Sequence, residues 1–179
     1  MESIVRGVVW KCGDGVSAYD IIGKDRWTMD KMDPAELGKW ALEGALPAVR
    51  NVPFGFKNLG YEIVIAGTDF GGGGKSIEHP IVALKGAGVT LVIAESFARY
   101  TFRNAINLGL PAIQCKGITE VFETGQQIEA DLLSGKIRNL STGASIEGTP
   151  LTDFVLDLVG SGGLLEYMRA KLASGRQDT

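Results

Sequence analysis

Four consecutive glycines, residues 71–74, stand directly before two side chains that can move a proton, Lys75 and Ser76. Backbone N–H groups in such a turn can point at an anion, and a helix that begins near Glu78 would add its dipole. Carboxylate binding is therefore the functional interpretation of this run. The alternative is a tight turn in which glycine only permits a positive φ, and the residues alone favour that structural interpretation.

The rest of the composition restricts which other sites the chain can build. Eighteen Lys and Arg stand against 21 Asp and Glu, and no basic run is present, so nucleic acid is not expected as a partner. Cys12 and Cys115 are the only cysteines and His79 is the only histidine, too few for an ordinary zinc or iron–sulfur site. The sequence has neither a signal-peptide pattern nor an apolar run near the ~20 residues of a membrane span, so a cytoplasmic location without membrane contact is expected.

Apolar segments and helix-like segments alternate on both sides of the glycine run. Buried strands are expected at residues 5–10, 62–66, 89–94 and 112–115. Helices are expected from near Glu78 to Gly86 or Gly88, and from Phe97 to Leu108. This alternation is typical of β-α-β units around a parallel sheet, so residues 71–76 should form an exposed loop at the carboxyl edge of the sheet.

The two ends of the chain carry other patterns. Asp33 and Pro34 predict the N-cap and first residue of a helix that runs to about Glu43. Residues 127–132 and 136–140, separated by Ser-Gly, predict a hairpin. A helical segment from Leu151 is expected to close the domain. Residues 1–173 are interpreted as a single domain and residues 174–179 as a frayed tail.

The sequence from Thr68 to Ile113 resembles the centre of the swivel domain of the aconitase and isopropylmalate dehydratase family. It reads TDFGGGGKSIEHPIVALKGAGVTLVIAESFARYTFRNAINLGLPAI, and the family pattern is N-F-G-x-G-S-S-R-E-H, then a helix and a strand, then S-F-A-R-I-F-x-R-N-x-x-N-x-G-L-P. The flanks VVWKCGDGVSAYDII, DPAELGKWALEG and ETGQQIEADLLSGKIRNLSTG are also similar to family elements. The resemblance covers nearly the whole chain and is strongest to the small subunits.

The resemblance implies a fold, a partner and a reaction. The fold is an α/β, three-layer swivelling β/β/α domain that closes over a larger subunit. In the family, three cysteines of that large subunit hold a [4Fe–4S] cluster, and the reaction is the reversible loss of water from a hydroxy acid. The absence of cluster ligands in this chain fits a small subunit, with no cofactor of its own.

The glycine run and its neighbours depart from the family pattern. Lys75 stands where the family has its catalytic serine, Ser76 matches the second serine, and Ile77 stands where the family has a substrate-binding arginine. Isoleucine cannot make the paired hydrogen bonds of a guanidinium, so the substrate should lack a carboxylate there or bind it differently. The resemblance assigns Gly72, Gly73 and Gly74, together with Ile77, to substrate binding.

A second polar element is altered as well. The family's D-T-D aligns with Ser17-Ala18-Tyr19, and Asp20 lies one place later, so Tyr19 and Asp20 are candidate catalytic residues. Arg26 aligns, after a one-residue gap, with an arginine that the family uses on substrate; the alternative is a solvated loop residue.

Other polar residues match the family without marking a substrate contact. His79 is by type a candidate acid or base, but the resemblance favours a structural role for Glu78 and His79. Arg99, Arg103 and Asn104 are interpreted as scaffold and subunit-interface residues.

Two functions from different classes remain. In the first, the chain pairs with an iron–sulfur large subunit as a hydro-lyase acting on a small hydroxy acid. In the second, it is a metal-free enzyme working alone, as an isomerase, lyase or ring-forming enzyme of specialised metabolism, with Lys75, Ser76, Tyr19 or Asp20 as its catalytic residues. A third and weaker hypothesis is a binding module without turnover, and a homo-oligomer is compatible with all three.

Overall fold

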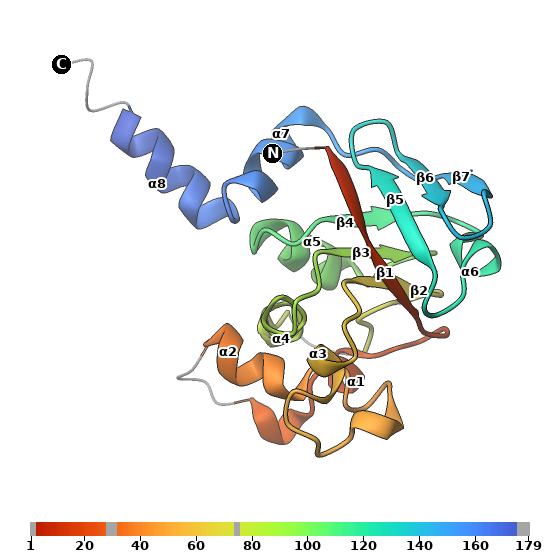
Figure 1. Cartoon of the computed structure of the whole chain (residues 1–179). Coiled ribbons are helices and arrows are strands. Elements are labelled where there is room, and N and C mark those ends of the chain that lie inside the picture. Colours follow the sequence, from red (N-terminus) through yellow and green to blue (C-terminus); the bar gives the residue numbers. More distant parts are fainter. Residues whose placement is uncertain (1–2, 28–31, 74–75, 175–179) are drawn as a thin grey trace.

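A computed structural model describes residues 3–27, 32–73 and 76–174, which form one seven-stranded sheet with helices around it (Figure 1). The strand order is β4-β3-β2-β1-β5-β6-β7. Neighbouring strands are parallel among β1 (Ile4–Lys11), β2 (Ile63–Ala66), β3 (Leu91–Ala94) and β4 (Ala112–Gln114). They are antiparallel from β1 through β5 (Gln127–Asp131), β6 (Lys136–Asn139) and β7 (Ser145–Glu147). The predicted strands and hairpin are confirmed, whereas β7 was not predicted.

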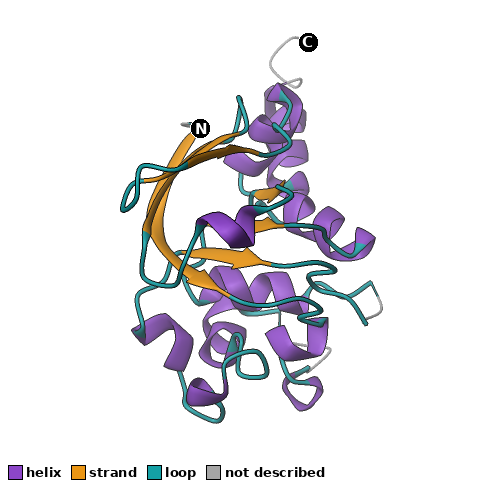
Figure 2. Cartoon of the chain, turned by 90° about the vertical axis from the view of Figure 1, so that its right-hand side faces the viewer, coloured by secondary structure: helices purple, strands orange, loops and turns teal. Residues whose placement is uncertain are grey.

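The two central parallel strands, β2 and β3, are apolar and buried throughout because both of their faces are covered. Val64 and Ala66 of β2 belong to a core cluster beneath the helices, whereas Ile63 and Ile65 belong to a second cluster that includes residues of β5 and β6. The sheet curls strongly (Figure 2), and β1 pairs with both its parallel and its antiparallel part. The predicted three-layer α/β fold is confirmed, and one curled sheet supplies both β layers.

The helices are mostly short. They are α1 (Ala18–Ile21), α2 (Pro34–Leu37), α3 (Gly55–Asn58), α4 (His79–Gly86), α5 (Arg99–Asn107), α6 (Ile118–Val121), α7 (Asp153–Gly160) and α8 (Leu164–Ser174). Three 3₁₀ turns lie among them, at Lys24–Arg26, Gly38–Trp40 and Pro47–Val49.

Two helix boundaries differ from the sequence prediction. The Asp33 side chain caps α2 as expected, but α2 ends at Leu37 and not near Glu43. At Gly38 the chain presses on α4 so closely that a Cβ atom there would lie 2.3 Å from the carbonyl carbon of Gly86. Helix α5 begins at Arg99 and not at Phe97, because Phe97 is extended and pairs with Phe70.

The C-terminal segment only partly closes the domain. Helix α7 buries Leu158 and Val159 in agreement with the prediction, but α8 has no buried residue and projects from the body of the molecule (Figure 1). Residues 175–179 lie outside the described part of the chain, so the frayed tail remains a prediction. Within the described residues, no helix combines the length and the apolar character that spanning a membrane requires.

Candidate active site at the ends of the parallel strands

The segments that follow β1, β2 and β3 meet at the carboxyl edge of the sheet. After β1, Asp14 accepts hydrogen bonds from the backbone N–H of Thr68 at 2.6 Å and from its hydroxyl at 3.0 Å. After β3, the Ser96 hydroxyl accepts from the backbone N–H of Asp69 at 2.9 Å. The polar residues of three strand ends therefore fix the position of the segment that leads into the glycine run.

The glycine run is held on both sides by backbone hydrogen bonds. Gly71 N–H donates to the carbonyl of Val16 at 2.7 Å, and Ala18 N–H donates to the carbonyl of Gly72 at 2.9 Å. The Thr101 hydroxyl of α5 donates to the carbonyl of Gly71 at 2.8 Å. The expectation of a fully exposed loop is wrong for Gly71 and Gly72, which are buried.

Local geometry accounts for three of the four glycines. Gly71 and Gly73 have φ values of 77° and 70°, where other residues are strained. A Cβ atom on Gly71 would lie 2.3 Å from the Thr101 hydroxyl oxygen, and one on Gly72 would lie 2.3 Å from a carboxylate oxygen of Asp69. At Gly71, Gly72 and Gly73, glycine is therefore explained by the tight turn and its close contacts, as the structural interpretation predicted. Gly74 and Lys75 lie outside the described residues.

Ser17, which the sequence interpretation did not include among the candidate residues, lies beside the glycine run. Its hydroxyl donates to an Asp20 carboxylate oxygen at 2.6 Å, and the same oxygen accepts from the Ser17 backbone N–H at 2.8 Å. Ser17 also pairs with Gly72 in an isolated bridge. Its signal in the sequence was the capping box, a serine three residues before an acid at the start of an apolar segment. The structure thus brings Ser17 and Asp20 to the glycine run.

Tyr19 enters a stack of three aromatic rings. Tyr19 is 37% exposed and stacks on Trp27, with ring centroids 5.0 Å apart. Trp27 in turn stacks on His79 of α4 at 6.0 Å. The stack joins a predicted catalytic residue to the helix that follows the glycine run.

The Arg26 side chain contacts residues that follow α2 and makes no hydrogen bond to the described part of the glycine run. Its Nε donates to Glu43 at 3.2 Å, its Nη2 donates to the Asn51 side chain at 3.2 Å, and its guanidinium lies 3.9 Å from the ring centroid of Trp40. Arg26 is thus neither a free loop residue nor, in this conformation, hydrogen-bonded to any described residue of the glycine run.

Ile77 and Ser76 complete the described part of the loop. Ser76 is exposed and Ile77 is half-buried. The side-chain amide of Asn104 in α5 donates to the Ile77 carbonyl at 2.9 Å. Asn104 therefore holds the loop exit in place, in agreement with its interpretation as a scaffold residue.

Two carboxylates near the strand ends are held in their charged forms. Hydrogen bonds from the Thr68 backbone and hydroxyl lower the pKa of Asp14. The Thr119 hydroxyl, and after it the Gly117 N–H, lower the pKa of Glu95. Both side chains are thus stabilised as anions that accept hydrogen bonds and are poorly suited to donate a proton.

The cysteines do not fit a cluster-binding role. Cys12 lies in the core cluster beneath the helices, whereas Cys115 lies in the cluster on the other face of the sheet. Burial raises the pKa of Cys12 to about 12 and that of Cys115 to about 11, so both remain protonated thiols. Among the described residues, no group of three or more His, Cys, Asp or Glu is arranged to hold a metal ion.

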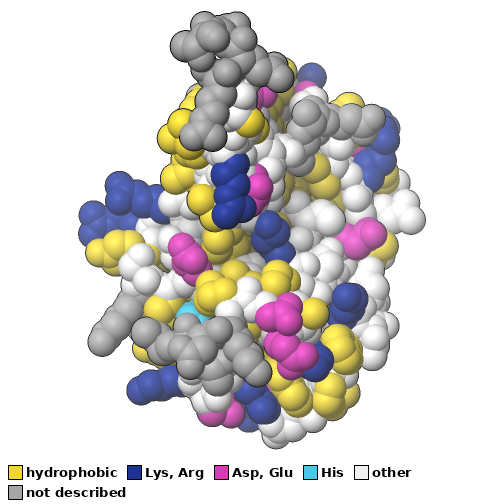
Figure 3. All heavy atoms as spheres, turned by 90° about the vertical axis from the view of Figure 1, so that its left-hand side faces the viewer, with side chains coloured by type: hydrophobic (Ala, Val, Ile, Leu, Met, Phe, Trp, Pro, Cys, Tyr) yellow, Lys and Arg dark blue, Asp and Glu magenta, His cyan; other side chains and the backbone are white. Residues whose placement is uncertain are grey.

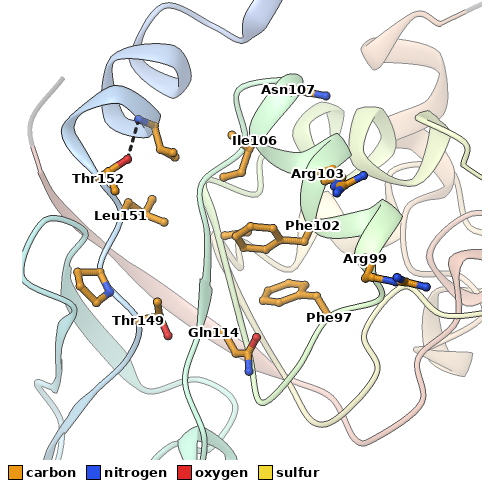
Figure 4. Close-up of a pocket in the computed structure, with 13 residues that line it drawn as sticks. Phe97, Arg99, Phe102, Arg103, Ile106, Asn107, Gln114, Thr149, Leu151 and Thr152 are labelled. Atoms are coloured by element: carbon orange, nitrogen blue, oxygen red, sulfur yellow. Dashed lines mark hydrogen bonds between the residues drawn. The ribbon is translucent and has the colours of Figure 1, made fainter.

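A separate apolar hollow lies on the other side of α5. Its volume is about 690 Å³, and Phe97 and Phe102 point across it toward residues 149–152 (Figure 4). Arg99 and Arg103 lie at its edge and point away from its centre. None of the candidate catalytic or substrate-binding residues that the structure describes lines this hollow, so it is distinct from the described part of the glycine run.

Comparisons with known proteins agree with this architecture. A family profile described as the aconitase C-terminal domain matches residues 44–117. The isopropylmalate/citramalate isomerase small subunit of Methanocaldococcus jannaschii is 41% identical over 98% of this chain and 100% of its own length. A 3-isopropylmalate dehydratase small subunit of Methanopyrus kandleri is 42% identical over 94% of this chain and 95% of its own.

A solved structure gives the same result for the fold. The crystal structure of 3-isopropylmalate dehydratase from Methanocaldococcus jannaschii superposes with a TM-score of 0.83 and 28% identity, covering 98% of this chain and 99% of that one. Sequence and fold agree along almost the whole length, and the chain belongs to the family of 3-isopropylmalate dehydratase small subunits.

Proposed function

We propose that this chain is the small subunit of a hydro-lyase that removes and returns water on a small hydroxy acid, together with a large subunit. The observation that carries the proposal is the near full-length match to relatives named as small subunits of isopropylmalate dehydratase and of isopropylmalate/citramalate isomerase. The large subunit would hold the [4Fe–4S] cluster that the family resemblance implies, a binding site for the substrate hydroxyl and carboxylate. A cytoplasmic location belongs to the same proposal.

In this proposal the chain supplies polar groups that face the substrate from the swivel domain. Lys75 and Ser76 are the proton-transfer candidates. The Ser17 hydroxyl donates to Asp20 and accepts from the Asp20 backbone N–H at 3.2 Å, so one lone pair is left to accept a hydrogen bond from a substrate hydroxyl. Tyr19 would form an aromatic wall beside them.

The test is reconstitution of the assembled enzyme. The chain is produced together with the large subunit from the same source, and hydration and dehydration are followed by ultraviolet absorbance of the unsaturated acid. 3-Isopropylmalate and citramalate are the first substrates, since relatives carry these names. Turnover that requires both chains supports the proposal, and an inactive, non-associating pair contradicts it.

Ile77 favours a second candidate, the enzyme that works alone without metal. The family has an arginine at this position, and its loss removes a group that a diacid substrate needs. The same reconstitution discriminates between the candidates, because turnover of a hydroxy acid by the metal-free chain alone would support the second and reject the first.

A further inference from the structure

His79 is a buried polar side chain for which the described residues supply no hydrogen-bond partner. It is the only histidine of the chain, the first residue of α4, and 8% exposed. Neither Nδ1 nor Nε2 has a partner, and the one other buried side-chain atom in this condition among the described residues is Oε2 of Glu43.

Packing does not account for an imidazole at this position. One ring face is covered by Trp27, and a phenylalanine ring would stack there equally well. A buried nitrogen without a partner loses its hydrogen bonds to water and gains none in return, so the imidazole makes the isolated fold less stable. The unpaired imidazole nitrogens of His79 can therefore form a hydrogen bond with a ligand that enters the site.

The position of His79 indicates what that partner is. The residue opens the eight-residue helix α4, where the helix dipole favours negative charge. It lies three positions after Ser76 and two after Ile77, which lacks the guanidinium found at that position in the family. Figure 3 shows a small part of the His79 side chain as a cyan patch at the surface, whereas both ring nitrogens are buried just beneath it.

We infer that His79 donates a hydrogen bond to a carboxylate oxygen of the substrate, a contact that remains available although the family's arginine is missing at residue 77. The inference rests on the proposed function for the identity of the substrate. One imidazole N–H makes one hydrogen bond where a guanidinium makes two, so the site binds a carboxylate more weakly and selects less strongly for a diacid. Trp27, stacked on the ring, fixes its orientation.

The first measurement is the thermal stability of the chain itself. His79→Phe should raise the Tm by about 2–4 °C, because it removes two unpaired nitrogens and keeps the stack on Trp27. Asn139 provides the control, because it is fully buried and its amide makes hydrogen bonds to Val121, Gln126, Ser141 and Thr142. Asn139→Leu should lower the Tm. A lower Tm for His79→Phe means that the fold already satisfies the imidazole, and this outcome overturns the inference.

The second measurement is the KM of the assembled enzyme for citramalate or 3-isopropylmalate. Loss of one hydrogen bond to a charged group should raise the KM about 10- to 100-fold in His79→Phe, with a much smaller change in kcat. His79→Gln keeps an N–H donor and should recover part of the loss. An unchanged KM in an active His79→Phe enzyme overturns the inference but leaves the proposed function intact. A wild-type pair without turnover contradicts the proposed function, and the Tm comparison still tests His79.

Discussion

At the scale of single residues, we expect the identity of residue 77 to determine which acid the proposed site can hold. A guanidinium binds a carboxylate through two parallel hydrogen bonds, whereas Ile77 offers apolar surface beside the exposed Ser76. The neighbouring groups compensate only in part, because Lys75 is by type a flexible point charge and His79 a single donor. The site should therefore favour a hydroxy acid with an apolar group near residue 77 over a second carboxylate.

We expect Lys75→Ala and Ser76→Ala each to lower kcat by ~10²–10⁴, the usual cost of losing a positioned proton-transfer group. The double change Lys75→Ser with Ile77→Arg should lower the KM for a diacid, because it restores the paired hydrogen bonds of the family. Lys75→Ser with Ile77→Lys is the matched control, with the charge but without the planar fork. Steady-state kinetics of the assembled enzyme measure all four. If both alanine variants keep the wild-type kcat, Lys75 and Ser76 are not catalytic, and the catalytic residues must be sought among Ser17, Tyr19 and Asp20.

Glu95 should make the stability of the fold depend on pH in acid. Its carboxylate accepts from the Thr119 hydroxyl at 2.5 Å and from Gly117 N–H at 3.1 Å, which lowers its pKa in the folded state below the ordinary value of 4.5. The stabilisation is complete above about pH 4.5 and is lost as the pH falls through the lower folded pKa. Urea unfolding at pH 6 and pH 3.5 should show a smaller loss of stability in Glu95→Gln than in wild type. Glu36→Gln, in an exposed ion pair, should behave like wild type.

At the scale of elements, the sequence correctly predicted those strands and helices whose local hydrophobic pattern matches their burial in the fold. The runs IVIA and LVIA are strands because they are apolar on both faces, and both faces are covered. The predicted helix boundaries were wrong where contacts between residues far apart in the sequence determine where a helix begins or ends. Close approach to Gly86 accompanies the end of α2, and the bridge between Phe70 and Phe97 delays the start of α5. Ser17 was missed because its pairing with Gly72 joins segments far apart in the chain.

Gly71 in the glycine run is required both for its positive φ and for its close contact with Thr101. Gly71→Ala should destabilise the fold by roughly 2–4 kcal/mol, because it combines a strained positive φ with a clash against Thr101. Gly143→Ala is the matched control, since its φ is 81° and no atom lies within 4 Å of the added Cβ. It should cost only about 1–2 kcal/mol. Urea denaturation measures both, and equal losses would show that Thr101 moves aside without cost.

At the scale of the whole molecule, the two core clusters define a body from which α8 stands apart. The clusters cover both faces of the parallel strands and extend to Leu151 at the start of the C-terminal segment. Helix α7 adds Leu158 and Val159 to the buried set. Helix α8 adds none, and the Tyr167 ring is joined to this body through an edge contact with Phe154 of α7 at 5.8 Å. We therefore expect the residues up to the end of α7 to supply nearly all of the free energy of unfolding, and α8 to add little.

Truncation tests this division of the molecule. A chain that ends at Gly163 should unfold with a free energy within about 1 kcal/mol of wild type, because the deleted helix buries no side chain and the Gly163 N–H still donates to Leu158 at 3.0 Å. A chain that ends at Pro150 loses the buried Leu151, Leu158 and Val159, and with them roughly 5 kcal/mol or more. Urea denaturation followed by circular dichroism measures both variants. If the shorter deletion destabilises the fold as much as the longer one, α8 contributes to the stability of the body through contacts other than burial of its own side chains.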